Sequence, residues 1–418
     1  MIAPERRKAV AVVLALVLVV LALAGGTVLH AGAADENGSD SLFLPVIVGS
    51  GAGGTPRPRI TPVPGCAGVT QIPIEECNAL VVLYNATNGP EWKDNRGWLA
   101  HTEPCRWFGV GCAPGAPGAP GHVRNLYLSD NRLLGEIPSE LGDLHYLEIL
   151  FLNDNRLTGT IPAALGNLGS LEELNLHVNR LTGSIPTELG NLRSLKRVLL
   201  YNNELTGPIP AELGNLSSLQ SLYLEANDLT GSIPAELGNL GVLERLNLHA
   251  NELTGSIPAE LGNLRYLEEL TLYRNELTGP IPSTLTALIW LDMFNFSETK
   301  ICVPDDPAIA EWFAGIQSVS TSDITCTSAP VLNAIDNADG DGDYTVSWSA
   351  DDNATSYALQ EAVGESFINS ATVYTGTETA YDVTGKAPGT YYYRVNAENE
   401  SGPSLWSNVE SIVVMSNP

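Results

Sequence analysis

A 24-residue period dominates the middle of the chain. Residues 171–194 spell LEELNLHVNRLTGSIPTELGNLRS, and residues 195–218 spell LKRVLLYNNELTGPIPAELGNLSS. Seven such blocks fill residues 123–290, starting at Val123, Leu147, Leu171, Leu195, Leu219, Leu243 and Leu267, and an eighth, degenerate block starts at Leu291. A fixed period of this length predicts a solenoid, in which each coil buries its apolar side against its neighbours.

Each block contains the elements of one coil. Leu174 and Leu176 alternate with polar residues, which predicts a short strand with one side facing a core. Asn179 follows where the chain must turn, and its amide can satisfy backbone groups of the turn and of the next coil. The same structural role is predicted for Asn131, Asn155, Asn179, Asn203, Asn227, Asn251 and Asn275.

The recurring pattern LxxLxLxxNxLTGxIPxxLGxLxx resembles the plant-type, 24-residue leucine-rich repeat. Such repeats form the ectodomains of plant receptor kinases, the polygalacturonase-inhibiting proteins and secreted bacterial proteins. Together with its caps, the resemblance covers residues 74–326. It implies an α/β leucine-rich-repeat solenoid, shaped as a horseshoe with a parallel sheet on its concave face, and it names no ligand.

The most variable block positions, three, five and seven, point away from the leucines and line the concave face. Aromatic, histidine and arginine side chains gathered on one surface are typical of an interface. Exposed Phe151 and Leu199 would cost solubility without a partner, although exposed strand positions can also simply drift. The predicted binding residues are Tyr127, Phe151, Asn153, Asn175, His177, Arg197, Leu199, Tyr201, Tyr223, Glu225, Arg245, Asn247, His249 and Tyr273.

Both ends of the repeats carry segments typical of caps. Residues 66–122 contain Trp92, Trp98, Trp107 and Phe108 just before the first coil, and resemble the N-terminal cap of plant-type repeats. The alternative is a platform of aromatic rings that binds sugar. Residues 291–326 are predicted to form the degenerate coil and a C-terminal cap, with short helices at 74–86 and 307–315.

The cysteines lie outside the regular repeats, at Cys66, Cys77, Cys105, Cys112, Cys302 and Cys326. Six cysteines allow 15 pairings. Proximity and the caps favour Cys66–Cys77, Cys105–Cys112 and Cys302–Cys326. None has the spacing of a metal site, so disulfides are expected.

The N-terminus is typical of a targeting segment. Arg6, Arg7 and Lys8 precede an apolar run, and small residues at 31–33 offer a cleavage site. Residues 1–34 are therefore predicted to be a signal peptide or, alternatively, a retained anchor, and 35–65 a flexible linker. The net charge of −27 argues against nucleic acid as a partner.

The pattern changes after the C-terminal cap. Short alternating strands and turns over residues 328–418 predict an all-β, immunoglobulin-like sandwich, and Trp348 with the run at 391–395 resembles a fibronectin type III domain. Residues 336–343 (DNADGDGD) resemble the start of a calcium loop but lack its closing glutamate, which favours a polar turn.

No catalytic motif accompanies these modules, and neither a metal nor a cofactor is expected. His177 and His249 arise from the repeat rather than from a catalytic triad. The sequence predicts an exported, non-catalytic protein that binds an extracellular protein or glycan through its concave face, and that meets a membrane only through an uncleaved anchor. The alternatives are a structural cell-envelope or matrix protein and an accessory module for polysaccharide degradation.

Overall fold

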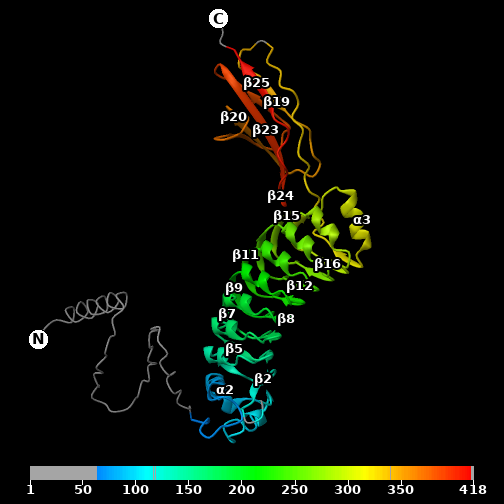
Figure 1. The fold of residues 1–418 in the computed structure, drawn as a ribbon. Helices are drawn as coiled ribbons and strands as arrows, with labels where there is room; N and C mark the ends of the chain where they lie inside the picture. The colour runs from blue at the N-terminus through cyan, green and yellow to red at the C-terminus, as the bar shows by residue number, and fades with distance from the viewer. Residues whose placement is uncertain (1–63, 116, 118, 339, 416–418) are drawn as a thin grey trace, which may run out of the picture. The chain divides into compact units, whose positions relative to one another are not determined.

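The computed structural model describes residues 64–115, 117, 119–338 and 340–415 (Figure 1). The predicted signal or anchor at 1–34 and nearly all of the predicted linker at 35–65 lie outside the described residues. All of the described residues belong to one compact unit.

One sheet of ten strands runs through all the coils. It is parallel except at β1, which pairs antiparallel with β2. Its strands, in spatial order, are β1 (Val110–Ala113), β2 (His122–Tyr127), β4 (Ile149–Phe151), β6 (Glu173–Asn175), β8 (Arg197–Leu199), β10 (Ser221–Tyr223), β12 (Arg245–Asn247), β14 (Glu269–Thr271), β16 (Met293–Asn295) and β18 (Ser318–Ser320). Leu174 pairs with Leu150 of the preceding coil and Val198 of the following coil, so identical block positions lie side by side. The exposed side of this sheet is called the sheet face below.

A second set of parallel strands, which the sequence did not predict, follows the turn of each coil. They are β3 (Leu134–Glu136), β5 (Arg156–Thr158), β7 (Thr182–Gly183), β9 (Glu204–Pro208), β11 (Asp228–Ser232), β13 (Glu252–Gly255), β15 (Glu276–Pro280) and β17 (Lys300–Cys302). Thr206 pairs with Asp228, and Thr230 pairs with Glu252. In both pairs a residue at block position twelve meets position ten of the next coil, so each strand is staggered relative to the one before. The exposed side of this set is called the flank.

Short 3-10 helices form the third side of each coil. They are η3 (Ser139–Asp143), η4 (Ala163–Asn167), η5 (Thr187–Asn191), η6 (Ala211–Asn215), η7 (Ala235–Asn239), η8 (Ala259–Asn263) and η9 (Ser283–Ala287). A proline such as Pro186 precedes each helix with an extended backbone. A Cβ on Gly190 would lie 2.4 Å from the carbonyl oxygen of Glu212 in the next coil, so the helices stack this closely only because the residue is glycine.

The core is a column of leucines. Leu171, Leu174, Leu176, Leu181 and Leu189 of one coil have no exposed surface, and the other coils repeat this arrangement. Burial of each such side chain contributes about 1.5–3 kcal/mol to stability. A coil has this apolar surface covered only when another coil or a cap lies on either side.

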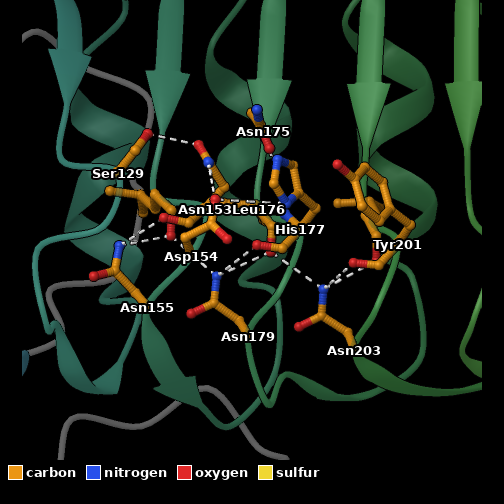
Figure 2. Close-up of polar contacts among 12 residues, drawn as sticks. Ser129, Asn153, Asp154, Asn155, Asn175, Leu176, His177, Asn179, Tyr201 and Asn203 are labelled. Carbon is orange, nitrogen blue, oxygen red and sulfur yellow. Dashed lines mark hydrogen bonds and ion pairs between the residues drawn. The ribbon is translucent and has the colours of Figure 1, made fainter.

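The turn asparagines join neighbouring coils (Figure 2). The Nδ2 of Asn179 donates to the carbonyls of Leu152 in the preceding coil and Leu176 in its own, each at 3.0 Å. Its Oδ1 accepts the N–H of Leu157 at 3.0 Å. The residue before it, Val178, has a φ of 51°, so the asparagine hydrogen bonds hold a turn of left-handed backbone.

Both caps cover the ends of the leucine column. At the N-terminus, helix α2 (Ile74–Ala86), with η1 (Gly89–Glu91) and η2 (Pro104–Arg106), packs with buried Trp92, Trp98 and Trp107. Because the three rings are buried, they form a core rather than a platform for sugars. Glu76 joins this cap to the first coil by accepting the N–H of Val123 at 2.8 Å.

At the other end, the degenerate coil and helix α3 (Pro307–Gly315) close the column. Trp312 and Phe313 pack against the buried ring of Phe294. Thr299 replaces the turn asparagine, and its hydroxyl donates to the carbonyl of Phe296 at 2.6 Å. The three disulfides are those predicted, Cys66–Cys77, Cys105–Cys112 and Cys302–Cys326.

The C-terminal residues form an all-β domain with its own core. Its strands are β19 (Tyr344–Ser347), β20 (Ser356–Ala362), β21 (Ala371–Gly376), β22 (Ala380–Val383), β23 (Gly389–Asn399), β24 (Gly402–Pro403) and β25 (Glu410–Val414). One sheet pairs β19 with β22, and the other has the order β21-β20-β23-β24, with β25 also on β23. Trp348, Leu359, Tyr393 and Val395 are buried between them. The finer resemblance to fibronectin type III stays a prediction.

Candidate functional site on the ten-stranded sheet

The predicted binding residues lie on the sheet face because the strands alternate their side chains. In β8, Val198 is buried in the core, whereas Arg197 and Leu199 on either side of it are accessible. Tyr201, two residues further on, is also partly exposed. Tyr127 is the most open of the predicted aromatic residues, with 43% of its surface exposed.

The aromatic residues are arranged in pairs across neighbouring coils. His177 stacks on Tyr201, with ring centroids 4.3 Å apart (Figure 2), and His249 stacks on Tyr273 at 4.2 Å. Tyr201 also meets Tyr223 edge-on at 6.4 Å. The two stacks follow from the 24-residue register, which places block position seven of neighbouring coils side by side, whereas the edge-on pair joins position seven of one coil to position five of the next. The rings therefore hold one another in a largely fixed arrangement.

Near the first coils, Tyr127 and Phe151 make a further edge-on pair, with ring centroids 5.5 Å apart. Both are at block position five. The ring contact explains how the phenylalanine predicted to be exposed is kept half-buried. Partly exposed aromatic residues such as these often contribute most of the binding energy in protein interfaces.

Glu225 occupies the space between the two histidine–tyrosine stacks in the row of position-seven residues. Its Oε2 is buried and has no hydrogen-bond partner among the described residues. Burial raises the pKa of Glu225 to about 7, and the charge of Glu269 adds to this rise. An ionised carboxylate oxygen can only accept hydrogen bonds, and the described residues supply no donor to this atom.

The two histidines are neutral at neutral pH. Burial lowers the pKa of His177, although Asp154, with a carboxylate oxygen 3.9 Å from Nδ1, opposes the shift. Burial also lowers the pKa of His249, and the positive charge of Arg274 adds to this effect. Neutral imidazole rings stacked on tyrosine provide flat apolar surface rather than charge.

The two predicted arginines are not free cations. Arg197 lies 3.5 Å from a carboxylate oxygen of Glu173 in the preceding coil. Arg245 lies within 4.0 Å of oxygens of Glu244, Glu268 and Glu269. Acidic neighbours, including Glu173 and Glu269 at block position three, therefore belong to the surface although they were not among the predicted residues.

Three predicted asparagines are nearly covered, with exposed fractions of 9% for Asn153 and 8% for Asn175 and Asn247. Asn153 accepts a hydrogen bond from Ser129 at 2.6 Å (Figure 2), and Asn247 accepts one from Thr271 at 2.6 Å. Their exposure was overestimated because the sequence does not show which neighbours lie over them. They are placed to support the sheet face rather than to contact a ligand broadly.

The described residues contain no group of three or more His, Cys, Asp or Glu side chains arranged to hold a metal ion. Across the same part of the chain, the structure has no helix with the length and apolar character needed to span a membrane.

Comparison with known proteins identifies the repeats. Models described as leucine-rich repeat match residues 121–181 and, separately, residues 194–216, 218–240, 242–264 and 266–288. No curated protein matches the chain. The middle of the chain thus consists of leucine-rich repeats, and its parallel sheet is that of a leucine-rich-repeat solenoid.

Several solved structures are similar to the chain. The ectodomain of the Arabidopsis receptor kinase HAESA, in complex with an N-terminally extended IDA peptide hormone, is 32% identical, with a TM-score of 0.50 over 59% of this chain and 41% of that one. PEPR1 with AtPEP1 is 32% identical, with a TM-score of 0.49 over 55% of this chain and 32% of that one. The Arabidopsis thaliana receptor kinase GASSHO1/SCHENGEN3 with CASPARIAN STRIP INTEGRITY FACTOR 2 is 33% identical, with a TM-score of 0.45 over 59% and 35%.

The chain thus spans between 32% and 41% of the length of each of these solved chains. Its repeats are similar to those of extracellular, ligand-binding modules, and its three disulfides are typical of an oxidising compartment. Both observations indicate an extracellular or cell-surface location.

Proposed function

We propose that the sheet face binds an extracellular protein or peptide ligand, and that Glu225 receives a basic side chain of that ligand. The observation that carries the proposal is the buried Oε2 of Glu225, which has no donor among the described residues. An ammonium or guanidinium group would supply the missing donor and neutralise the charge. The ligand would therefore complete a contact that the protein leaves open.

The surroundings of Glu225 suit a cation. Tyr201 of the preceding coil meets Tyr223, two residues before Glu225, edge-on, and a cation near their rings gains a further attraction. The half-buried site has a lower effective dielectric constant than water, which strengthens a charge pair. The similarity to the HAESA ectodomain, which was solved with a peptide hormone, supports a peptide as the ligand class. A glycan ligand stays a prediction with no further support.

The test is binding of the full-length protein to an array of short synthetic peptides that vary in basic and acidic content. Peptides with arginine or lysine are expected to be retained, and Glu225→Gln is expected to weaken their binding by about tenfold to a hundredfold. Because the pKa of Glu225 is about 7, retention should also increase as the pH rises through 7.

The matched control is Glu236→Gln, which removes the same charge from the same coil but at an exposed position in η7. It should leave peptide binding unchanged. Tyr201→Ala and Tyr223→Ala should weaken binding of the same peptides. Equal retention of basic and acidic peptides, or equal losses from Glu225→Gln and Glu236→Gln, would refute the role of Glu225. Unchanged binding in both tyrosine variants would favour a structural role for the solenoid instead.

A further inference from the structure

The flank carries a row of charges that is segregated by sign. Block position ten lies at the start of most second-set strands, and two residues before the start of β3 and β7, and it points outward, next to a buried leucine such as Leu205. The first three coils have arginine there and the next four have acids. The row is Arg132, Arg156, Arg180, Glu204, Asp228, Glu252 and Glu276, and all seven side chains are exposed.

Elsewhere the solenoid pairs opposite charges between neighbouring coils. Lys196 contacts Glu172 of the preceding coil at 2.6 Å, and Arg274 contacts Glu298 of the following coil at 2.9 Å. The last acid of the flank row follows this pattern, since Glu276 pairs with Lys300 at 2.6 Å.

The other six members of the row have no ion pair or side-chain hydrogen bond among the described residues. They are Arg132, Arg156, Arg180, Glu204, Asp228 and Glu252. Even at the point where the sign changes, Arg180 and Glu204 do not pair. With a strand spacing of about 4.8 Å and a stagger of two residues, neighbouring row members lie about 8 Å apart, within a Debye length at physiological salt. Like charges at this spacing repel, so the segregation has a cost that the protein does not offset internally.

Reversing the order of the six unpaired charges places an acid opposite each base and a base opposite each acid. A two-fold axis between the third and fourth coils would place Arg180 opposite Glu204 of a second copy. The same operation would place Arg156 opposite Asp228, and Arg132 opposite Glu252. Each contact would occur twice, as the isologous interface of a two-fold dimer requires.

The surface between the charges allows such an approach. Two residues after each charge, most coils have a threonine, such as Thr182, Thr206 or Thr230, and a glycine follows it, as at Gly207 and Gly231. The arginine and glutamate side chains are therefore longer than their neighbours on the flank. A long polyanion would be attracted by the arginines but repelled by the acids, and a polycation would be attracted by the acids but repelled by the arginines. A second copy of the chain has charges complementary to both the basic half and the acidic half of the row.

We propose that the flank is a self-association surface through which two copies of this chain pair antiparallel. The interface is held by Arg132, Arg156 and Arg180 of each copy against Glu252, Asp228 and Glu204 of the other. It is independent of the ligand surface, because the sheet face and the flank are formed by different strands. The net charge of −27 on each copy opposes association, so the dimer is weak and needs enough salt to screen the distant charges but not the close pairs.

The experiment measures the mass of the full-length protein by sedimentation velocity over a range of concentrations. A dimer is expected at an ionic strength of about 0.15 M and its loss at about 1 M, where the Debye length falls to about 3 Å. Arg156→Glu with Arg180→Glu should weaken association by about 100-fold or more, because it places like charges opposite each other. The control, Arg193→Glu with Arg265→Glu, makes the same change in net charge at exposed positions outside the row and should leave the dimer intact.

Mixing provides the decisive result. Glu204→Arg with Asp228→Arg should also be monomeric on its own. When this variant is mixed with Arg156→Glu/Arg180→Glu, two of the four contacts between these positions have both charges reversed and two are native, so all four are complementary and a heterodimer is expected. Circular dichroism should show both variants folded, as their exposed positions predict. A monomeric wild-type protein at about 0.15 M salt, a dimer unaffected by the arginine reversal, or a mixture that stays monomeric would each overturn the proposal.

Discussion

The sheet face and the flank are built from the same coils, yet their side chains behave in opposite ways. On the sheet face, equivalent positions lie side by side, and neighbours satisfy one another, as in the His177–Tyr201 stack at 4.3 Å. On the flank, the charges of the row stay unpaired over six coils, although the Glu276–Lys300 pair at 2.6 Å shows that equivalent residues of adjacent coils can reach one another there. The choice of side chain in each coil thus determines whether a repeated position becomes a contact within the protein or a group available to another molecule.

Glu225 is the exception that makes the comparison useful. The other members of its row contact side chains of neighbouring coils, and within this row the buried atoms without a hydrogen-bond partner among the described residues are its own Oε2 and the Nδ1 of His177. A single acidic group without a partner differs from a whole row of unpaired charges. The first suits one basic group of a ligand, and the second suits a surface with the same spacing.

The largest expected effect comes from substituting Asn227, whose hydrogen bonds join the strands of the two surfaces. Asn227 donates to the carbonyls of Leu200 at 3.2 Å and Leu224 at 3.0 Å, beside the sheet face, and accepts the N–H of Leu205 at 3.1 Å, in the flank strand β9. Asn227→Ala leaves these buried groups unpaired, and we expect a loss of about 3 kcal/mol in the free energy of unfolding. Urea unfolding measures it.

The adjacent control is Asn202→Ala. Asn202 is exposed and has a φ of 52°, but Ala226 and Ala250 occupy the equivalent position in the next two coils with similar backbone angles. The loss should stay below about 0.5 kcal/mol. If the two substitutions cost the same, the asparagine hydrogen bonds do not join the two sheets in the way the structure indicates.

Much of this scaffold follows from the sequence because it depends on local pattern and on the period. The leucine positions define the core, and the segments 74–86 and 307–315 form the predicted helices α2 and α3 with the same bounds. The disulfide pairing also follows, since each predicted pair is close in sequence and flanks a cap.

The parts that the sequence did not predict depend on how coils stack. The second set of strands is one such part, because β7 pairs with β9 only once two coils are in contact. The near-complete burial of Asn175 and the unpaired Oε2 of Glu225 depend in the same way on side chains of the adjacent coils. A row by row comparison of the blocks, with acids and bases marked, would have revealed the flank charges.

The second prediction concerns the pH dependence of stability that Glu225 alone among the residues of the sheet face should cause. Its pKa of about 7 in the folded state lies above its ordinary value of 4.5, so the folded protein binds more protons between these pH values. Stability should therefore fall as the pH rises from about 4.5 to 7 and stay lower above 7. Glu225→Gln removes this dependence. After allowance for solvent at the sheet face, we expect a gain of about 1–2 kcal/mol at pH 8 and none at pH 4.

Glu236→Gln, at the exposed position in the same coil, should show no such gain at either pH. A stability gain in a variant that also loses basic peptides would mean that the protein keeps Glu225 at a cost in stability, as binding sites commonly do. If Glu225→Gln were less stable than the wild type at pH 8, the carboxylate would have an internal partner, and the argument for a ligand cation would fail.

The smallest expected effect concerns the turn between the two surfaces. Val178 has a φ of 51°, and a β-branched residue is unfavourable in this left-handed region. Asn202 occupies the equivalent position in the next coil with a φ of 52°, and asparagine adopts this conformation readily. Val178→Asn should therefore stabilise the protein by about 0.5–1 kcal/mol, and Asn202→Val should destabilise it by a similar amount. Opposite and nearly equal shifts in the thermal unfolding temperature would show that this turn carries backbone strain of its own, separate from both faces. The Val178 side chain is 39% exposed at the border of the sheet face. Shifts of the same sign would mean that its contacts outweigh the backbone preference.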